Sequence, residues 1–174
     1  MTSVMLLDTL AERSEEAVKD LLMPMKPTKE DPEPAIRAPT VYKARLPDGK
    51  ASTKYAPYIL HTVINTSYNQ PVGEQPQGIC NVRTLFCVYS PDESKGGIYL
   101  LNCMERIRID LMRDPILADQ FQLDYEGGLE QLVYPDDTAP FYLGEMMTVW
   151  SMPHPVRRED WRIWLEKPDP NPRK

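Results

Sequence analysis

Apolar residues in the first 24 positions recur at helical spacing, and most charged residues fall on the opposite side. Thr2 or Ser3 could cap such a helix, and Pro24 and Pro27 would end it. The pattern predicts an amphipathic helix within residues 1–24 that forms part of the core. Its apolar positions are Leu7, Leu10, Ala11, Ala17, Val18, Leu21 and Leu22.

Residues 25–39 combine prolines with charges, which favours an extended connector over a helix or a central strand. Two β-favouring runs follow, at 41–46 and 55–65, and Asp48-Gly49 between them is a strong turn signal. We therefore expect two strands joined by a turn, the second being the better core candidate because its run at 58–64 is uninterrupted.

The segment 67–78 is polar and punctuated by prolines and glycines, and it is too long for a tight hairpin. Loops of this length either make contacts or are merely connecting segments, and the sequence favours neither. We take Tyr68 and Val72 within it as candidate interface residues.

Residues 81–90 have the β-branched and aromatic content of a buried strand. A second amphipathic helix is predicted from about Ile98 to Arg113, with Arg106 and Asp110 spaced for an ion pair on its solvent side. Its apolar stripe, expected to pack on the sheet, is Leu100, Met104, Ile107 and Leu111.

Three further strands are predicted at 121–125, 129–134 and 141–152. The last alternates so that apolar groups point to both sides, which predicts cover on both faces, by helices or by a neighbouring subunit. The chain then closes with a proline-bracketed arm, 153–174. Because tryptophans in a charged arm are typical docking anchors, the candidate interface residues there are Trp161, Ile163, Trp164 and Leu165.

These elements predict an α+β fold: a mostly antiparallel or mixed sheet with two amphipathic helices on one face. The expected organisation is a helix at 1–24 belonging to the core, a connector at 25–39, an α+β core domain at 40–152 and an extended arm at 153–174.

Composition narrows the classes of function. A formal net charge of −6 and a pI near 5.0 argue against sequence-independent nucleic-acid binding, although an acidic wall suits a pore through which DNA slides without sticking. Cys80, Cys87 and Cys103 form no CxxC pair and are expected to be reduced core thiols. The start lacks the basic region of a secretory signal and no segment is apolar for long enough to span a bilayer, which predicts a cytosolic protein.

Motifs for catalysis are missing from the sequence: there is no GxSxG, no GxxxxGK[ST] and no HExxH. Gly96-Gly97 lacks the further glycines and the lysine of a phosphate loop, so it is expected to be ordinary turn chemistry. His61 is the one passable general base, and a lone strand histidine is more often structural. We therefore expect no catalytic residue, no cofactor and no metal.

The segments NVRTLFCVYSPDESKGGIYLLNCMERIRIDLMRDPIL and FYLGEMMTVWSMP, together with the order of elements, resemble the tail terminator and tail-completion (minor tail) proteins of phages and prophages. The resemblance covers roughly residues 55–155 and rests on pattern, without invariant catalytic motifs. The connector and the tryptophan-containing arm depart from the compact family pattern.

The resemblance implies a mixed or antiparallel sheet with helices on one face, assembled as a ring, usually a hexamer, on the last ring of the tail tube. Expected partners are other copies of the chain, the tail tube protein and a head-completion or neck protein, with DNA passing through the lumen without specific binding and no membrane contact. The expected location is the virion tail, assembled in the host cytoplasm. Two alternatives stay open: a head-completion or connector protein of the neck, and an enzyme or nucleic-acid-processing accessory with an unrecognised site.

Overall fold

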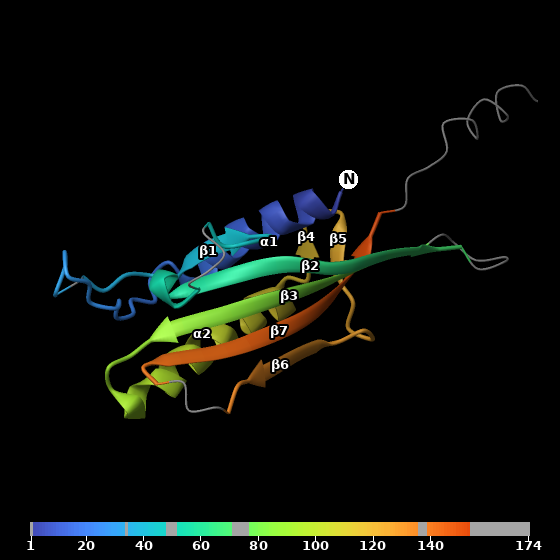
Figure 1. Cartoon of the computed structure of the whole chain (residues 1–174). Coiled ribbons are helices and arrows are strands. Elements are labelled where there is room, and N and C mark those ends of the chain that lie inside the picture. The colour runs from blue at the N-terminus through green and yellow to red at the C-terminus, as the bar shows by residue number, and fades with distance from the viewer. Residues whose placement is uncertain (1, 34, 48–51, 71–76, 136–138, 154–174) are drawn as a thin grey trace, which may run out of the picture.

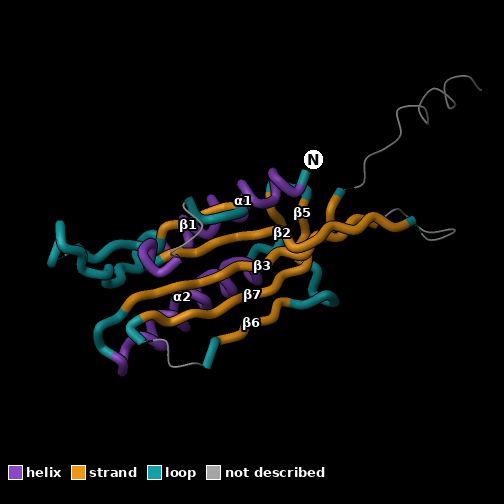
Figure 2. The backbone as a smooth tube through the Cα atoms, in the orientation of Figure 1, coloured by secondary structure: helices purple, strands orange, loops and turns teal. Residues whose placement is uncertain are grey.

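A single twisted mixed sheet forms the centre of the molecule, and both helices lie against one of its faces (Figures 1 and 2). The computed structural model describes residues 2–33, 35–47, 52–70, 77–135 and 139–153. This architecture confirms the predicted α+β class. The helices are α1 (Ser3–Val18) and α2 (Glu93–Arg113), with a short 3-10 turn η1 (Ser52–Tyr55). The strands are β1 (Thr40–Lys43), β2 (Tyr58–Asn69), β3 (Gln77–Tyr89), β4 (Ile116–Leu117), β5 (Phe121–Leu123), β6 (Leu129–Val133) and β7 (Phe141–Met152).

The strands follow the order β1-β2-β3-β7-β5-β4, and β6 pairs with the middle of β7. The antiparallel registers of β2, β3 and β7 place alternate residues of each strand on the face that the helices cover. Trp150 lies on this face with no exposed surface, and its indole Nε1 donates to Thr148 Oγ1 at 2.9 Å. The same interior holds Leu6, Leu10, Ile59, Val82, Phe86, Phe121 and Met146.

Helix α2 begins earlier than its apolar periodicity indicates. The Asp92 side chain caps it by accepting from the Ser94 N–H at 3.0 Å, so the segment ESKGG is helical instead of a turn. A Cβ on Gly96 would lie 1.9 Å from the Tyr142 ring, and glycine there lets the β7 tyrosine pack directly on the helix. The predicted stripe is confirmed, since Leu100, Met104, Ile107 and Leu111 are all buried.

Helix α1 confirms the first predicted helix, with Thr2 as its cap, but it ends at Val18, before Pro24. Leu21 and Leu22, predicted to continue its apolar side, lie beyond it, and Leu22 is exposed. Helix α1 is tied to α2 by charge: Arg13 Nε donates to Asp110 at 2.5 Å and its Nη1 to Asp114 at 2.8 Å. Arg106 pairs with Asp20 just beyond α1. The predicted pair of Arg106 with Asp110 within α2 is therefore wrong, because each finds its opposite charge on the neighbouring segment.

Strand β1 runs parallel to β2, with Thr40 opposite Tyr58 and Lys43 opposite His61. The two strands therefore do not form the simple turn-linked pair that Asp48-Gly49 suggested; the chain must travel back between them, partly through η1. Residues 48–51 lie outside the described part. The connector contains no helix or regular strand among its described residues, and Met23 and Arg37 exchange two backbone hydrogen bonds at its base, of 2.8 and 3.0 Å.

Most of the described part of the predicted loop 67–78 is strand. Pairing between β2 and β3 continues to Asn69 opposite Gln77, so the segment is the distal part of a long hairpin. Tyr68 faces Gly78 across this pair, and a Cβ on Gly78 would lie 2.8 Å from Tyr68 Cε1. An aromatic ring thus covers the bare backbone of the opposite glycine, which supports strand pairing in a segment whose composition favours a loop.

Candidate assembly surfaces

His61, the candidate general base, is an interior residue. Its side chain has no exposed surface, and its two ring nitrogens lie 2.8 Å from Thr84 Oγ1 and 3.0 Å from Ser14 Oγ. Burial lowers the pKa of His61 to about 3, so the imidazole is neutral at physiological pH. It joins α1 to β2 and β3 and is closed to a substrate.

The three cysteines are buried and free, as expected. Burial raises the pKa of Cys80, and raises the pKa of Cys87 and of Cys103 to about 12, so these thiols are protonated and poor nucleophiles at neutral pH. Among the described residues no group of three or more His, Cys, Asp or Glu is placed to hold a metal ion. None of the described helices is long and apolar enough to cross a bilayer.

The hairpin of β2 and β3 projects past the ends of both helices (Figure 1). Pairing with β1 stops at His61, so within the described chain residues 62–69 form the outer edge of the sheet. Ile64, at a bulge, is 53% exposed and Tyr68 is 48% exposed. Tyr68 is thus the one predicted interface residue that the structure places, on an accessible strand with an open edge, which is a surface suited to pairing with another chain.

The sheet face opposite the helices carries a second apolar cluster. It forms a groove of about 430 Å³ whose walls include Tyr58, Leu60, Leu85 and Leu143. Neither α1 nor α2 lies on this face (Figure 2), although Tyr55 of η1 packs against the cluster. The prediction that β7 is covered on both sides is therefore confirmed for the helix side, and on the other side cover by a neighbouring subunit stays a prediction.

A polar network borders this groove. Arg83 Nε donates to Glu145 Oε2 at 2.5 Å, Arg83 Nη2 donates to the Tyr134 hydroxyl at 2.9 Å, and that hydroxyl donates to Glu145 at 2.9 Å. Each group satisfies another, so the network fixes three side chains on the open face. Such an arrangement offers a rigid polar rim beside an apolar groove, which is the common anatomy of a protein interface.

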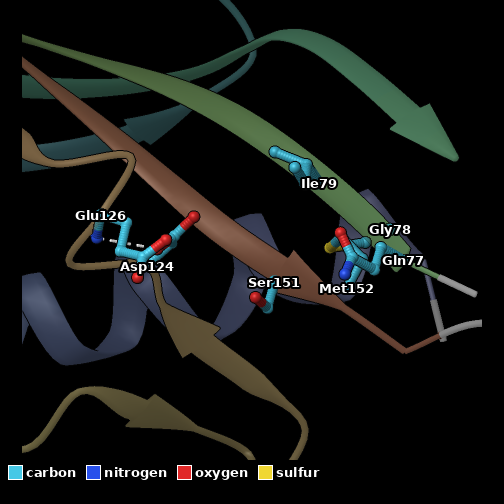
Figure 3. A pocket seen from close by; sticks show the side chains of 7 residues that line it. All are labelled: Gln77, Gly78, Ile79, Asp124, Glu126, Ser151 and Met152. Atoms are coloured by element: carbon cyan, nitrogen blue, oxygen red, sulfur yellow. Dashed lines mark hydrogen bonds between the residues drawn. The ribbon is translucent and has the colours of Figure 1, made fainter. Parts of the chain in front are cut away.

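A second hollow, of about 360 Å³, lies where β3 begins and β7 ends (Figure 3). Gly78, Ser151 and Met152 line it from the strands, and Asp124 and Glu126 line it from the turn after β5. The Asp124 side chain accepts from the Glu126 N–H at 2.9 Å, which holds the turn. Since Met152 is at this wall, the arm that starts at Pro153 begins beside an acidic hollow.

The remaining predicted interface residues, Val72, Trp161, Ile163, Trp164 and Leu165, lie outside the described residues. The groove on the sheet face opposite the helices could not be predicted from the sequence, because its residues come from separate segments: β2, β3, β7 and the segment after β1. Only the double-sided apolar pattern of residues 141–152 signalled it.

No protein-family model matches the chain, and no curated protein matches it in sequence. Among solved structures, it is similar to a chain of "Virion of native gene transfer agent (GTA) particle", with a TM-score of 0.40 and 10% identity, over 64% of this chain and 77% of that chain. The neighbour belongs to a virion-type particle, but a likeness of this degree carries no argument about the role of this chain.

Proposed function

We propose that the chain is a structural subunit of a phage or prophage particle, and more specifically a tail terminator. In this role it forms a ring at the head-proximal end of the tail tube, stops tube growth and joins the tail to the head or neck. The observation that carries the proposal is the architecture: a mixed sheet with both helices on one face, as the sequence resemblance implies.

The distribution of chemistry supports a structural role. His61, the general base that the sequence suggests, is sealed inside the molecule, and the thiols are buried and protonated. The accessible features are instead a projecting hairpin, an open strand edge and an apolar groove with a fixed polar rim. Features of this kind typically bind other protein chains, so in this proposal the protein acts through its interfaces.

The partners in this proposal are other copies in a ring, which the resemblance implies to be a hexamer, then the tube protein on one side and a head-completion or neck protein on the other.

 The DNA would pass through the lumen without specific contacts, which the net charge of −6 favours because a repulsive wall does not hold a polyanion. The site of action is the virion tail, after assembly in the host cytoplasm.

The interface residues in this proposal are those the sequence singled out. Tyr68 lies near the end of β2, and Val72 follows it in the sequence, outside the described residues. In this proposal the hairpin of β2 and β3 contacts a neighbouring subunit. Trp161, Ile163, Trp164 and Leu165 anchor the arm on a neighbouring subunit or on another tail protein, since buried aromatic anchors can each contribute about 2 kcal/mol or more of binding.

Electron microscopy of negatively stained protein, alone and mixed with tail tubes, tests the proposal. We expect closed rings, and tubes that carry a ring at one end only. Rings that bind head connectors but leave tubes bare would place the subunit in the neck instead. A strict monomer that binds neither structure would overturn the structural role.

A further inference from the structure

Helix α2 carries a second apolar stripe on the side that faces away from the sheet. Ile98, Leu101, Ile109 and Met112 are 57%, 49%, 45% and 45% exposed, so about half of the surface of each residue is open to solvent. Together with Glu105 they follow one side of the helix over four turns, opposite the buried stripe. A helix that is apolar on both sides needs a second partner.

The spacing of this outer stripe is symmetric about Glu105. Leu101 and Ile109 each lie four residues from Glu105, and Ile98 and Met112 each lie seven residues from it. A second copy of α2 laid antiparallel, with the twofold axis at Glu105, therefore sets Ile98 against Met112 and Leu101 against Ile109. The same contacts repeat on the other side of the axis, as a twofold contact between identical surfaces requires.

The charges at the centre fit the same arrangement. Arg108 Nε donates to Glu105 Oε1 at 3.0 Å, and Arg108 Nη2 donates to Glu105 Oε2 at 2.5 Å. Glu105 would approach its own counterpart at the axis, and an arginine from each copy would flank the two carboxylates. Packed helices lie about 8–10 Å apart, a gap that an arginine side chain can cross, so the cluster of four charges is neutral.

We propose that the outward face of α2 is a twofold self-association surface, on which α2 of a second copy packs antiparallel. The occupant is a second copy of this chain because the apolar spacing and the central charges are both self-complementary. This contact is distinct from the head-to-tail contacts of a ring, and it would join two subunits, or two rings, back to back.

The mass of the full-length chain in solution, measured by sedimentation over a concentration series, tests the proposal. Arg108→Glu places four carboxylates at the axis, and we expect the mass of the assembly to halve, with at least a tenfold weaker association. The double variant Glu105→Arg, Arg108→Glu restores a neutral cluster and should restore the mass. Leu22→Glu is the matched control, because Leu22 is 54% exposed but lies outside the stripe.

The readout is a halving of the assembly's mass, whatever its starting value. This separates the twofold contact from ring formation, because a pair of rings would dissociate to single rings and a dimer to monomers. Should Arg108→Glu unfold the chain, Leu101→Glu replaces it. An unchanged mass in both variants overturns the proposal while leaving the terminator role intact.

Cross-linking tests the orientation. Ile98→Cys chains mixed with Met112→Cys chains should form a disulfide between copies under mild oxidation, whereas Ile98→Cys alone should not; the native thiols are buried and do not compete. Cross-linking of Ile98→Cys with itself would show a parallel pair, and would overturn the antiparallel arrangement.

Discussion

The two sides of α2 carry similar residues and have opposite surroundings. On the inner side Leu100, Met104, Ile107 and Leu111 are at most 2% exposed, whereas the outer apolar residues are about half exposed. Helical spacing alone does not distinguish the stripe that the chain covers from the stripe that it leaves open. The difference teaches that an apolar stripe at helical spacing can be buried or half exposed within one helix, and the exposed stripe is the one that we propose a second copy covers.

The largest expected effect is on the inner side of α2. Leu111→Ala should lower the free energy of unfolding by roughly 2–5 kcal/mol, because it leaves a cavity against the sheet. Leu101→Ala, on the outer side, should change it by no more than about 0.5 kcal/mol in the isolated subunit. Urea denaturation of both variants at a concentration where the chain is not associated measures the contrast. An unchanged denaturation midpoint for Leu111→Ala would contradict the burial of the inner stripe against the sheet.

Acid should act on the covered side through His61. The folded-state pKa of about 3 lies below the ordinary value of 6.5, so in the range between them the unfolded chain binds a proton that the folded chain does not. Stability should therefore fall as the pH falls below 6.5, by at most about 1.4 kcal/mol per pH unit.

The variant His61→Gln keeps hydrogen-bonding capacity without titrating, so its stability should depend less on pH. Thermal unfolding of both proteins between pH 7 and about 5 isolates this effect, because ordinary carboxyl groups titrate mainly below that range. Identical slopes for the two proteins would contradict a neutral buried imidazole.

The ion pairs between α1 and α2 should matter less. Arg13→Ala removes the contacts to Asp110 and Asp114, which are partly shielded from solvent, and should cost about 1 kcal/mol, less at high salt. Lys19→Ala, which breaks an exposed pair with Glu16, is the control and should have almost no effect. Equal losses of unfolding free energy for both variants in chemical denaturation would show that the ion pairs between α1 and α2 contribute no more to stability than an exposed pair.

The smallest effect on the fold is expected from the arm. Trp161→Ala combined with Trp164→Ala should leave the thermal unfolding of the subunit unchanged while sharply reducing its incorporation into particles. Normal incorporation together with loss of the cooperative transition would mean that these tryptophans belong to the core of the subunit.

Local patterns in the sequence predicted much of the fold. Strand β7 has the predicted bounds, Phe141–Met152, and the inner stripe of α2 is buried as expected, because alternation and helical spacing indicate which residues share one face of an element. The features that the sequence did not predict correctly depend on contacts between segments that are distant in the sequence. The parallel pairing of β1 with β2, the two-residue strand β4 and the partners of Arg106 have no local signature.

The candidate surfaces were less accessible to prediction. Tyr68 was singled out as part of a polar segment expected to be a loop, but its place on a paired strand depends on β3 and Gly78. The residues of the outer stripe of α2 are apolar in the sequence, but only the structure shows that Ile98 and Met112 remain about half exposed. Burial is a property of the whole fold, and a pattern of residues cannot supply it.

The most direct test of the terminator role is whether the protein blocks growth of a tail tube. Preformed tubes are incubated with the full-length chain and then challenged with labelled tube protein, and the labelled length added at each end is measured by electron microscopy. We predict that one end stops elongating while the other continues as in the untreated sample. Elongation at both ends, equal to that of tubes without the protein, would contradict the account.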